Sequence, residues 1–405
     1  MKPMRVFSSR VTQQTLRFFS HFLSFKVPEI FEGKDSLPKI PFWLKKKGCK
    51  HPLLICGKGI RRAGLEKPLL EALAKEGIET SIYDGVVPNP TFSNIYEAKE
   101  IYLKENCDSL IALGGGSNMD AAKALGALLA NPKKKLEDLK GVLKVRHPLP
   151  PLIAIPTTAG TGSEATIASV IVNEKTGDKF AINDPKLIPQ LAVLDDSLLE
   201  GLPPSVVAST GMDALTHAIE AYIGSENTSD TKKHALEAIS LIHDHLVPFY
   251  EDRNSEIDRK AMQKASFLAG LAFTRAYVGY VHALAHALGG KYNLPHGYTN
   301  AVLLPHVLEA YREKAYKKLS KISDSLSLTE KKASKEEKAK AVISWIKDLK
   351  EKLSLPDKFP LGTIKKEDLD ALASHADKEA NPLYPVPKEF DKDELKEILM
   401  ESAEF

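Results

Sequence analysis

The sequence contains few cysteines and no long uncharged apolar run. Among its 405 residues only Cys49, Cys56 and Cys107 are cysteines, an odd number without CxxC spacing. This set argues against a disulfide-stabilised fold and against a zinc-ribbon site, and it fits a reducing cytoplasm. No run approaches the roughly 18 uncharged apolar residues of a membrane-spanning helix. We therefore expect a cytoplasmic protein without a membrane span.

The chain also lacks an excess of either charge. Its 56 basic and 53 acidic residues give a formal net charge of +3, and the two signs are interleaved along the sequence. Because binding to a phosphate backbone depends on concentrated positive charge, no nucleic-acid partner is expected. A hydrophobic content of 43% is enough for one large domain or two ordinary domains with real cores.

The first 26 residues form an N-terminal extension with an unusual composition. They are basic, contain several serines and precede the first acidic residue, Glu29. This composition resembles a transit peptide, so mitochondrial targeting is one interpretation. The interpretation that we favour is a docking helix with Val11, Leu16, Phe19 and Leu23 on one face.

Two kinds of pattern divide the rest of the chain near Gly201–Pro204. In residues 27–202, short runs rich in Leu, Ile and Val, such as PLLIC, TSIYD, SLIALGGGS and QLAVLDD, alternate with helical patterns. This alternation predicts an α/β domain built on a parallel sheet. In residues 203–405 long helical periodicities dominate, and they predict an all-helical second domain.

Two loops rich in small residues follow predicted strands of the first domain. In SLIALGGGSNMDAAK three glycines, Gly114–Gly116, precede a helix for which Ser117 is the predicted N-cap, with Asp120 three residues later. Such a turn can cradle a phosphate, but GGGS alone is equally typical of a tight turn. A second loop, PTTAGTGSEAT from Pro156 to Thr166, offers hydroxyl groups after another strand. Two such loops indicate the crevice where open α/β sheets bind nucleotides.

Several histidines in the second domain have spacings that suit a metal site. Asp213 and His217 are four residues apart in TGMDALTHAIEAYIG, so they share one helix face. A capping box that begins at Thr210 would explain Asp213 without a metal. However, the segment VHALAHALGGKYNLPHG adds His282, His286 and His296. Several titratable groups in apolar helices are costly to bury without partners. Three imidazoles and one carboxylate suit Fe(II), Zn(II) or another divalent transition metal.

Taken in order, four motifs resemble those of the iron-containing (group III) alcohol dehydrogenase family. They are GGGSNMDAAK, PTTAGTGSEAT, GMDALTHAIEAYIG and VHALAHALGGKYNLPHGYTNAVLLPHV, within a similarity that extends from about residue 27 to the NP segment near Asn381. The resemblance implies a Rossmann-like dinucleotide-binding domain, an all-α domain and an active site in the cleft between them. It also implies a homodimer that transfers a hydride between a primary alcohol or aldehyde and NAD(P), with the metal as Lewis acid.

The resemblance assigns roles to individual positions. The implied metal ligands are Asp213, His217, His282 and His296, with iron favoured and zinc possible. His286 matches the non-ligand active-site histidine, which we expect to relay the hydroxyl proton; the alternative is that it orients a ligand. The implied cofactor-binding residues are Gly57, Asn89, Gly115, Gly116, Ser117, Asp120, Thr157, Thr158, Thr161 and Lys179, and the implied substrate contacts are Thr166, Phe273 and Arg275.

Two departures from the family pattern affect specificity. Arg275 stands where the family usually has a small or amide residue, so it predicts a polar or anionic substrate unless it pairs with a carboxylate. Gly57 stands where relatives that prefer NAD carry Asp, and three basic residues follow it closely. An acid at this position would bind the ribose 2′-hydroxyl and repel a 2′-phosphate, so we favour NADP over NAD. The basic residues are Lys58, Arg61 and Arg62.

Three other functions fit parts of the pattern. A metal- and NAD-dependent lyase of the dehydroquinate-synthase type shares the predicted architecture, but it needs several basic residues around a phosphorylated, carboxylated substrate. The predicted cleft segments supply mainly Arg275 and Lys179. A zinc-dependent polyol dehydrogenase would use the same kinds of ligand. A non-catalytic metal-stabilised scaffold has no use for a nucleotide cradle.

Overall fold

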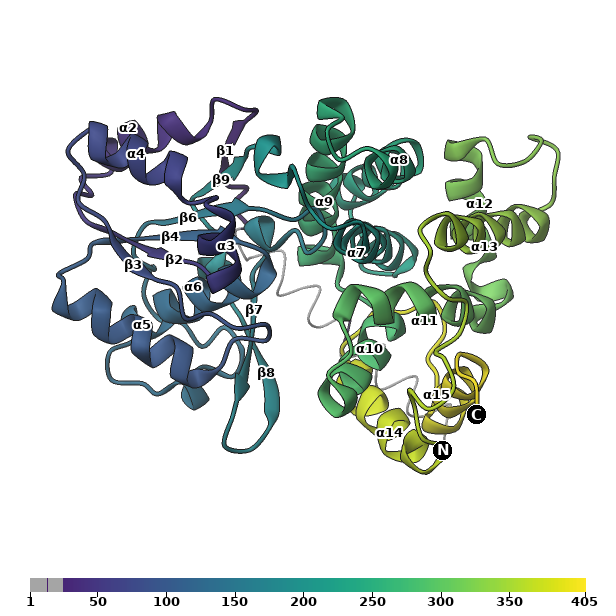
Figure 1. Ribbon diagram of the computed structural model, residues 1–405. Helices are drawn as coiled ribbons and strands as arrows, with labels where there is room; N and C mark the ends of the chain where they lie inside the picture. The colour runs from purple at the N-terminus through teal and green to yellow at the C-terminus, as the bar shows by residue number, and fades with distance from the viewer. Residues whose placement is uncertain (1–12, 14–24) are drawn as a thin grey trace. The chain divides into compact units, whose positions relative to one another are not determined.

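The computed structural model describes residue 13 and residues 25–405, which belong to two compact units (Figure 1). Residues 25–201 form the first unit, and residues 202–405 belong to the second. The docking helix and the targeting signal considered for the N-terminal extension lie outside the described residues, apart from Gln13. The side-chain amide of Gln13 donates hydrogen bonds of 3.0 Å to the carbonyls of Pro382 and Tyr384. No described helix is long and apolar enough to cross a membrane.

A six-stranded sheet, parallel throughout, forms the centre of the first unit (Figure 1). Its strands carry continuous apolar runs because helices cover both faces of such sheets. The run SLIALG, for example, is buried at all six positions. The strand order is β1 (Glu29–Glu32), β9 (Leu191–Leu194), β6 (Leu152–Pro156), β4 (Ser109–Gly114), β2 (Pro52–Ile55) and β3 (Ser81–Tyr83).

The helices of the first unit connect these strands. The longest, α6, follows β4 directly, and its alanine-rich sequence is buried at ten positions, so it packs into the core. The α-helices are α2 (Ile40–Lys46), α3 (Lys58–Ala63), α4 (Lys67–Lys75), α5 (Phe92–Lys104) and α6 (Gly116–Leu129). Short 3-10 helices are η1 (Leu37–Lys39), η2 (Leu136–Leu139), η3 (Ser163–Ala165), η4 (Pro185–Leu187) and η5 (Asp196–Leu199).

The chain reverses its direction of travel across the sheet between β2 and β4. From β2 it moves outward to β3, and it then crosses back over β2 to form β4, β6 and β9 on the other side. Such a switch point leaves a crevice at the carboxyl ends of the two strands, where open parallel sheets bind ligands. Gly57 follows β2, and Gly114–Gly116 end β4 and open α6. The fold therefore places these predicted nucleotide loops at the switch point.

A second, three-stranded sheet was not predicted from the sequence. It consists of β5 (Gly141–Val142), β8 (Asp178–Asn183) and β7 (Ala168–Asn173), with β7 and β8 antiparallel. β7 also packs against α6. The hydroxyl-rich loop after β6 is therefore followed by β7, a strand that packs against α6.

Residues 202–405 contain no β-strand and form the predicted all-helical unit. The helix α7 begins at Pro204, where a proline is well tolerated, and it is buried at nearly every position after Thr210. It packs against α8, α9 and α11. The helices are α7 (Pro204–Ile223), α8 (Ser229–Glu251), α9 (Glu256–Ala276), α10 (Tyr280–Tyr292), α11 (His296–Tyr311), α12 (Glu313–Leu326), α13 (Lys335–Lys352), η6 (Lys366–Asp368), α14 (Leu369–Ala380) and α15 (Lys392–Glu401).

Candidate functional site

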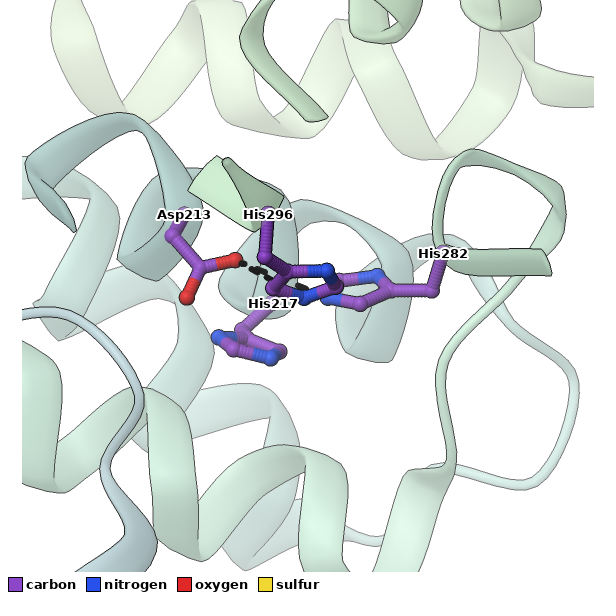
Figure 2. A group of neighbouring side chains, drawn as sticks. All are labelled: Asp213, His217, His282 and His296. Carbon is purple, nitrogen blue, oxygen red and sulfur yellow. Dashed lines mark ion pairs between the residues drawn. The ribbon is translucent and has the colours of Figure 1, made fainter. Parts of the chain in front are cut away.

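Three helices of the second unit bring four metal-binding side chains together (Figure 2). Asp213 and His217 lie one turn apart on α7, His282 lies on α10, and His296 is the first residue of α11. One donor atom from each side chain lies within 4.8 Å of the other three donor atoms. Three of the residues are buried, whereas 38% of the His296 side chain is exposed. The site is therefore accessible on the His296 side.

The distances between the donor atoms suit a shared ion. Oδ1 of Asp213 lies 3.5 Å from Nε2 of His296 and 3.8 Å from Nε2 of His282 (Figure 2). Ligand atoms that lie roughly 2.1 Å from a tetrahedral ion are about 3.4 Å apart. The rings of His217 and His282 also stack, with 4.4 Å between their centroids. Three imidazoles and a carboxylate at these separations fit a divalent transition metal.

The explanation of Asp213 as part of a capping box is wrong. Thr210 lies inside α7, which begins six residues earlier at Pro204, and its hydroxyl donates to the carbonyl of Val206 at 2.8 Å. Burial lowers the pKa of His282 well below its ordinary value, and the neighbouring imidazoles lower it further. The neutral imidazole that results is the form that binds metal.

Glu220, which the sequence analysis missed, orients one of the ligands. Its Oε2 lies 2.6 Å from Nδ1 of His282 and accepts a hydrogen bond from the amide of Gly279 at 2.7 Å, while Oε1 accepts one from Val281 at 2.8 Å. A carboxylate on Nδ1 fixes the ring so that Nε2 faces the ion. Burial raises the pKa of Glu220 to about 7, although the backbone hydrogen bonds oppose this.

Asn300 is a second residue that the sequence analysis missed. It lies one turn after His296 on α11, and its Nδ2 donates to Oδ1 of Asp213 at 2.7 Å. The same nitrogen lies 3.3 Å from Nε2 of His282 and 3.1 Å from Nε2 of His296. Because one small group contacts three donor atoms, those atoms converge on a single point.

His286 lies beside the four ligands but is not one of them. Its ring is stacked at 5.2 Å on that of His296 and lies 6.1 Å from that of His282. Its Nδ1 lies 2.6 Å from Oε1 of Glu379, a further residue that the sequence analysis missed. Since Glu379 is 93 residues away in sequence, no local pattern could have indicated it.

The two predicted substrate contacts of α9 differ in position. Phe273 stacks on His217, with 4.2 Å between ring centroids, so it provides an apolar wall next to the metal ligands. Arg275 lies two residues further along α9 and is half-buried. Residues two apart on a helix do not face the same way, so Arg275 leaves α9 on a different side from Phe273. The substrate role of Arg275 stays a prediction.

In the first unit, the two predicted nucleotide loops lie directly against each other. A Cβ on Gly115 would lie 3.4 Å from Oγ1 of Thr158, and a Cβ on Gly116 would lie 2.8 Å from Cγ2 of Thr161. Glycine is therefore needed for this close approach. The N-cap predicted at Ser117 is wrong, because Gly115 occupies that position and Ser117 lies within the first turn of α6. The N-terminus of α6 is still a place where the positive end of the helix dipole favours an anion.

Lys123 on α6 anchors the second loop to the helix. Its ammonium group is fully buried and lies within hydrogen-bonding distance of five oxygen atoms. They are the carbonyl and hydroxyl oxygens of Ser163 and of Thr166 and the carbonyl oxygen of Ala168. These distances range from 2.5 to 3.0 Å. Thr166, a predicted substrate contact, is only 3% exposed. The Thr166 hydroxyl accepts a hydrogen bond of 2.8 Å from Lys123, so Thr166 helps to hold the loop in place.

Two carboxyl groups interact electrostatically with Lys123: that of Glu164, which is 1% exposed, and that of Asp120, a half-buried residue. Burial raises the pKa of Asp120 to about 6 and that of Glu164 to about 7, although the Lys123 charge opposes both shifts. Burial lowers the pKa of Lys123 to about 8. Asp120, predicted to bind cofactor, accepts a hydrogen bond of 3.4 Å from Ser163 Oγ. This observed contact also ties the loop to α6.

The remaining predicted cofactor residues lie in the loops after β2, β3 and β6 and at the start of β8. Gly57 caps α3, and a Cβ there would lie 2.9 Å from the carbonyl oxygen of Val86, so its lack of a side chain has a packing reason. Lys179 donates to Oδ1 of Asn89 at 2.8 Å. The hydroxyl-rich loop starts at Thr157, whose amide donates to the carbonyl of Gly114 at 3.1 Å.

The basic residues after Gly57 are not all available for a phosphate. Arg61 forms an ion pair of 3.0 Å with the buried Glu66 and lies 3.7 Å from Asp84. Lys58 and Arg62 are exposed. The positive charge near Gly57 is therefore smaller than the sequence indicates.

Comparison with known proteins identifies relatives over nearly the whole chain. Residues 28–196 match the family model for iron-containing alcohol dehydrogenase, and residues 207–403 match the model for the C-terminal part of the Fe-containing alcohol dehydrogenase family. Alcohol dehydrogenase 4 of Saccharomyces cerevisiae (strain YJM789) is 39% identical over 389 residues, which cover 95% of this chain and 100% of the yeast protein.

Two further proteins are also similar to nearly the whole chain. The NADPH-dependent butanol dehydrogenase of Clostridium saccharobutylicum is 34% identical, covering 93% of this chain and 97% of that protein. The crystal structure of a 1,3-propanediol oxidoreductase superposes with a TM-score of 0.90 at 34% identity, covering 94% of this chain and 99% of that one. The fold predicted from the sequence is thus confirmed, and the predicted cluster of three histidines and one aspartate is present in the structure. The chain therefore belongs to the iron-containing alcohol dehydrogenase family and is an NAD(P)-dependent enzyme of that family.

Proposed function

We propose that the chain interconverts a primary alcohol and its aldehyde, with hydride transfer to or from the nicotinamide of NADP or NAD. The observation that carries this proposal is a cluster of four potential metal ligands whose donor atoms lie within 4.8 Å of one another: Asp213, His217, His282 and His296. The parallel sheet of the same chain also has a switch point between β2 and β4, where sheets of this kind bind nucleotides. We propose Fe(II) as the ion, with Zn(II) as the alternative, because the same donor set accepts both. When bound, such an ion acts as a Lewis acid toward the substrate oxygen.

The protein's own residues have distinct proposed tasks. Glu220 holds His282 through Nδ1, the nitrogen opposite the donor Nε2, so this ring needs little rearrangement when it binds an ion. Phe273 presents an aromatic surface beside His217, which excludes water from that side. We propose that His286 accepts the hydroxyl proton during alcohol oxidation and returns it during aldehyde reduction.

We propose that the cofactor binds at the carboxyl ends of the central strands. Its phosphates would lie at the N-terminus of α6, where the positive end of the helix dipole favours an anion. We propose NADP over NAD because no carboxylate follows β2 at Gly57 to repel a 2′-phosphate. The ion pair of Arg61 with Glu66 leaves Lys58 and Arg62 to attract one. The proposed cofactor residues are Gly57, Asn89, Gly115, Gly116, Ser117, Asp120, Thr157, Thr158, Thr161 and Lys179.

A panel assay tests the activity. The purified enzyme is loaded anaerobically with Fe(II) or Zn(II), and reduced nicotinamide absorbance is followed with NADP and NAD against short alcohols, 1,3-propanediol and a polyol. Turnover of primary alcohols that requires metal supports the proposal. If no alcohol or aldehyde in the panel changes the absorbance after metal loading, the proposed substrate class is wrong.

We further propose a cytoplasmic homodimer. The cysteines are all buried and reduced, in keeping with a reducing compartment. One chain has a mass of 44.5 kDa. Sedimentation equilibrium that gives twice this mass supports the dimer, whereas the mass of a single chain contradicts it.

A further inference from the structure

Glu379 joins α14 to the histidine that we propose as the proton carrier. Its Oε1 lies 2.6 Å from Nδ1 of His286, and the same oxygen accepts a hydrogen bond of 2.9 Å from the hydroxyl of Tyr384. Only 24% of the Glu379 side chain is exposed. The imidazole therefore meets a carboxylate that is itself held in place by a tyrosine.

The charge of Glu379 determines which nitrogen of His286 carries the proton. Oε1 of Glu379 accepts the hydrogen bond from the Tyr384 hydroxyl and faces Nδ1 of His286, so the carboxylate is placed as an acceptor in both contacts. An ionised carboxylate can only accept hydrogen bonds. Nδ1 of His286 must therefore be the donor, and in the neutral ring Nε2 is then the acceptor.

We propose that Glu379 is a positioning residue for the reaction: it fixes the tautomer and the ring orientation of His286, so that Nε2 is the nitrogen that exchanges a proton with the substrate hydroxyl. This inference rests on the proposed function of His286. The proton moves between the hydroxyl oxygen and Nε2, while the Nδ1 proton stays in its hydrogen bond to Glu379. The hydride passes separately between the carbinol carbon and the nicotinamide of the proposed cofactor, so alcohol oxidation releases one proton to Nε2 and one hydride to the cofactor.

The docking of α14 on α10 does not depend on Glu379. Tyr280 of α10 donates a hydrogen bond of 2.8 Å to Asn381, just after α14. At the other end, Asp368 accepts a hydrogen bond of 2.6 Å from Tyr292 and forms an ion pair of 3.1 Å with Lys291. Because these contacts join the same two helices, the carboxylate of Glu379 is not required merely to attach them.

The experiment is a double-mutant cycle on the metal-loaded enzyme with Glu379→Gln and His286→Ala. Glutamine keeps the size of the side chain but offers both a donor and an acceptor, so it no longer selects the tautomer. We expect Glu379→Gln to lower kcat about 10- to 100-fold, the usual effect of losing such a carboxylate. Metal content and the KM for cofactor should stay within about twofold, since neither the ligands nor the nucleotide loops are changed.

Asp368→Asn is the matched control, because it removes a carboxylate that joins α14 to α10 without contacting His286. Its kcat should stay within about twofold of wild type. In the His286→Ala background, Glu379→Gln should have no further effect on kcat. An equal fall in both backgrounds, or an unchanged kcat in the single variant when His286→Ala is slow, overturns the role of Glu379. An unchanged kcat in His286→Ala itself overturns the proton role of His286 instead.

Discussion

Replacing Lys123 by methionine should loosen the hydroxyl-rich loop after β6 and destabilise the first unit. The ammonium is fully buried and contacts five oxygen atoms of Ser163, Thr166 and Ala168. Methionine has a similar volume, so the change removes a charge and its hydrogen bonds without opening a large cavity. Breaking a buried charge cluster in this way costs about 3–5 kcal/mol.

The cost should depend on pH, with a sign set by the two neighbouring acids. Their raised pKa values, about 6 for Asp120 and about 7 for Glu164, mean that the folded unit keeps them protonated at a pH where the unfolded chain ionises them. Loss of the Lys123 charge raises both values further. The penalty is therefore small below pH 5, where both acids are protonated, and it increases as the pH rises through about 6 to 7, while Lys123, with a pKa of about 8, still carries its charge.

Thermal unfolding of wild type and Lys123→Met at pH 5 and pH 7 measures this penalty. A loss of about 3 kcal/mol lowers the Tm of a unit of this size by roughly 6–12 °C, and we expect this shift at pH 7 and less than half of it at pH 5. The KM for cofactor should rise as well, because Thr158 and Thr161 lie in the loosened loop. Equal Tm shifts at the two pH values, or a shift below about 2 °C at pH 7, would refute the reasoning.

Four further predictions concern the metal, the proton and specificity. Asp213→Ala or His282→Ala should lose the ion and lower kcat by at least about 100-fold while the α/β unit stays folded; full metal occupancy by elemental analysis contradicts this. His286→Ala should keep the ion and slow turnover about 100-fold or more, so metal loss would make it a ligand. Gly57→Asp should shift preference toward NAD about tenfold relative to Gly57→Ala, which reproduces the contact with Val86; equal ratios for the two variants contradict it. Arg275→Leu should lower the specificity constant for an ω-carboxylated alcohol about tenfold relative to the neutral one if Arg275 binds substrate, and an unchanged ratio rejects that role.

The sequence was sufficient to predict the helical unit and the central sheet except for its edge strand β1, whose sequence EIFE is mostly exposed. Runs such as SLIALG are buried at every position and almost wholly apolar because both faces of a parallel sheet are covered, and this makes them conspicuous. The hairpin of β7 and β8 was missed, although ASVIVN alternates between half-buried and buried positions over its first four residues. The N-cap of α6 was misplaced because Ser117 is a common capping residue, whereas the close approach of Thr161 to Gly116 is visible only in three dimensions.

For the site, sequence spacing indicated the side chains that share a helix face but not those that hold them. Asp213 with His217, and His282 with His286, are each four residues apart and were therefore conspicuous. Glu220 contacts His282 across 62 residues, so the pair depends on how α7 packs against the start of α10. Contacts of that range follow from tertiary packing and not from a local pattern.

The surroundings of the two α10 histidines explain why one can be a ligand and the other a proton carrier. Both rings meet a carboxylate at 2.6 Å, so the hydrogen bond alone does not distinguish them. His282 is 2% exposed, and its pKa is lowered by burial, so it remains neutral and available to an ion. His286 is 32% exposed and has the ionised Glu379 beside it, which suits a group that must exchange protons. Helical spacing gives the two residues the same face, and their different burial gives them different chemistry.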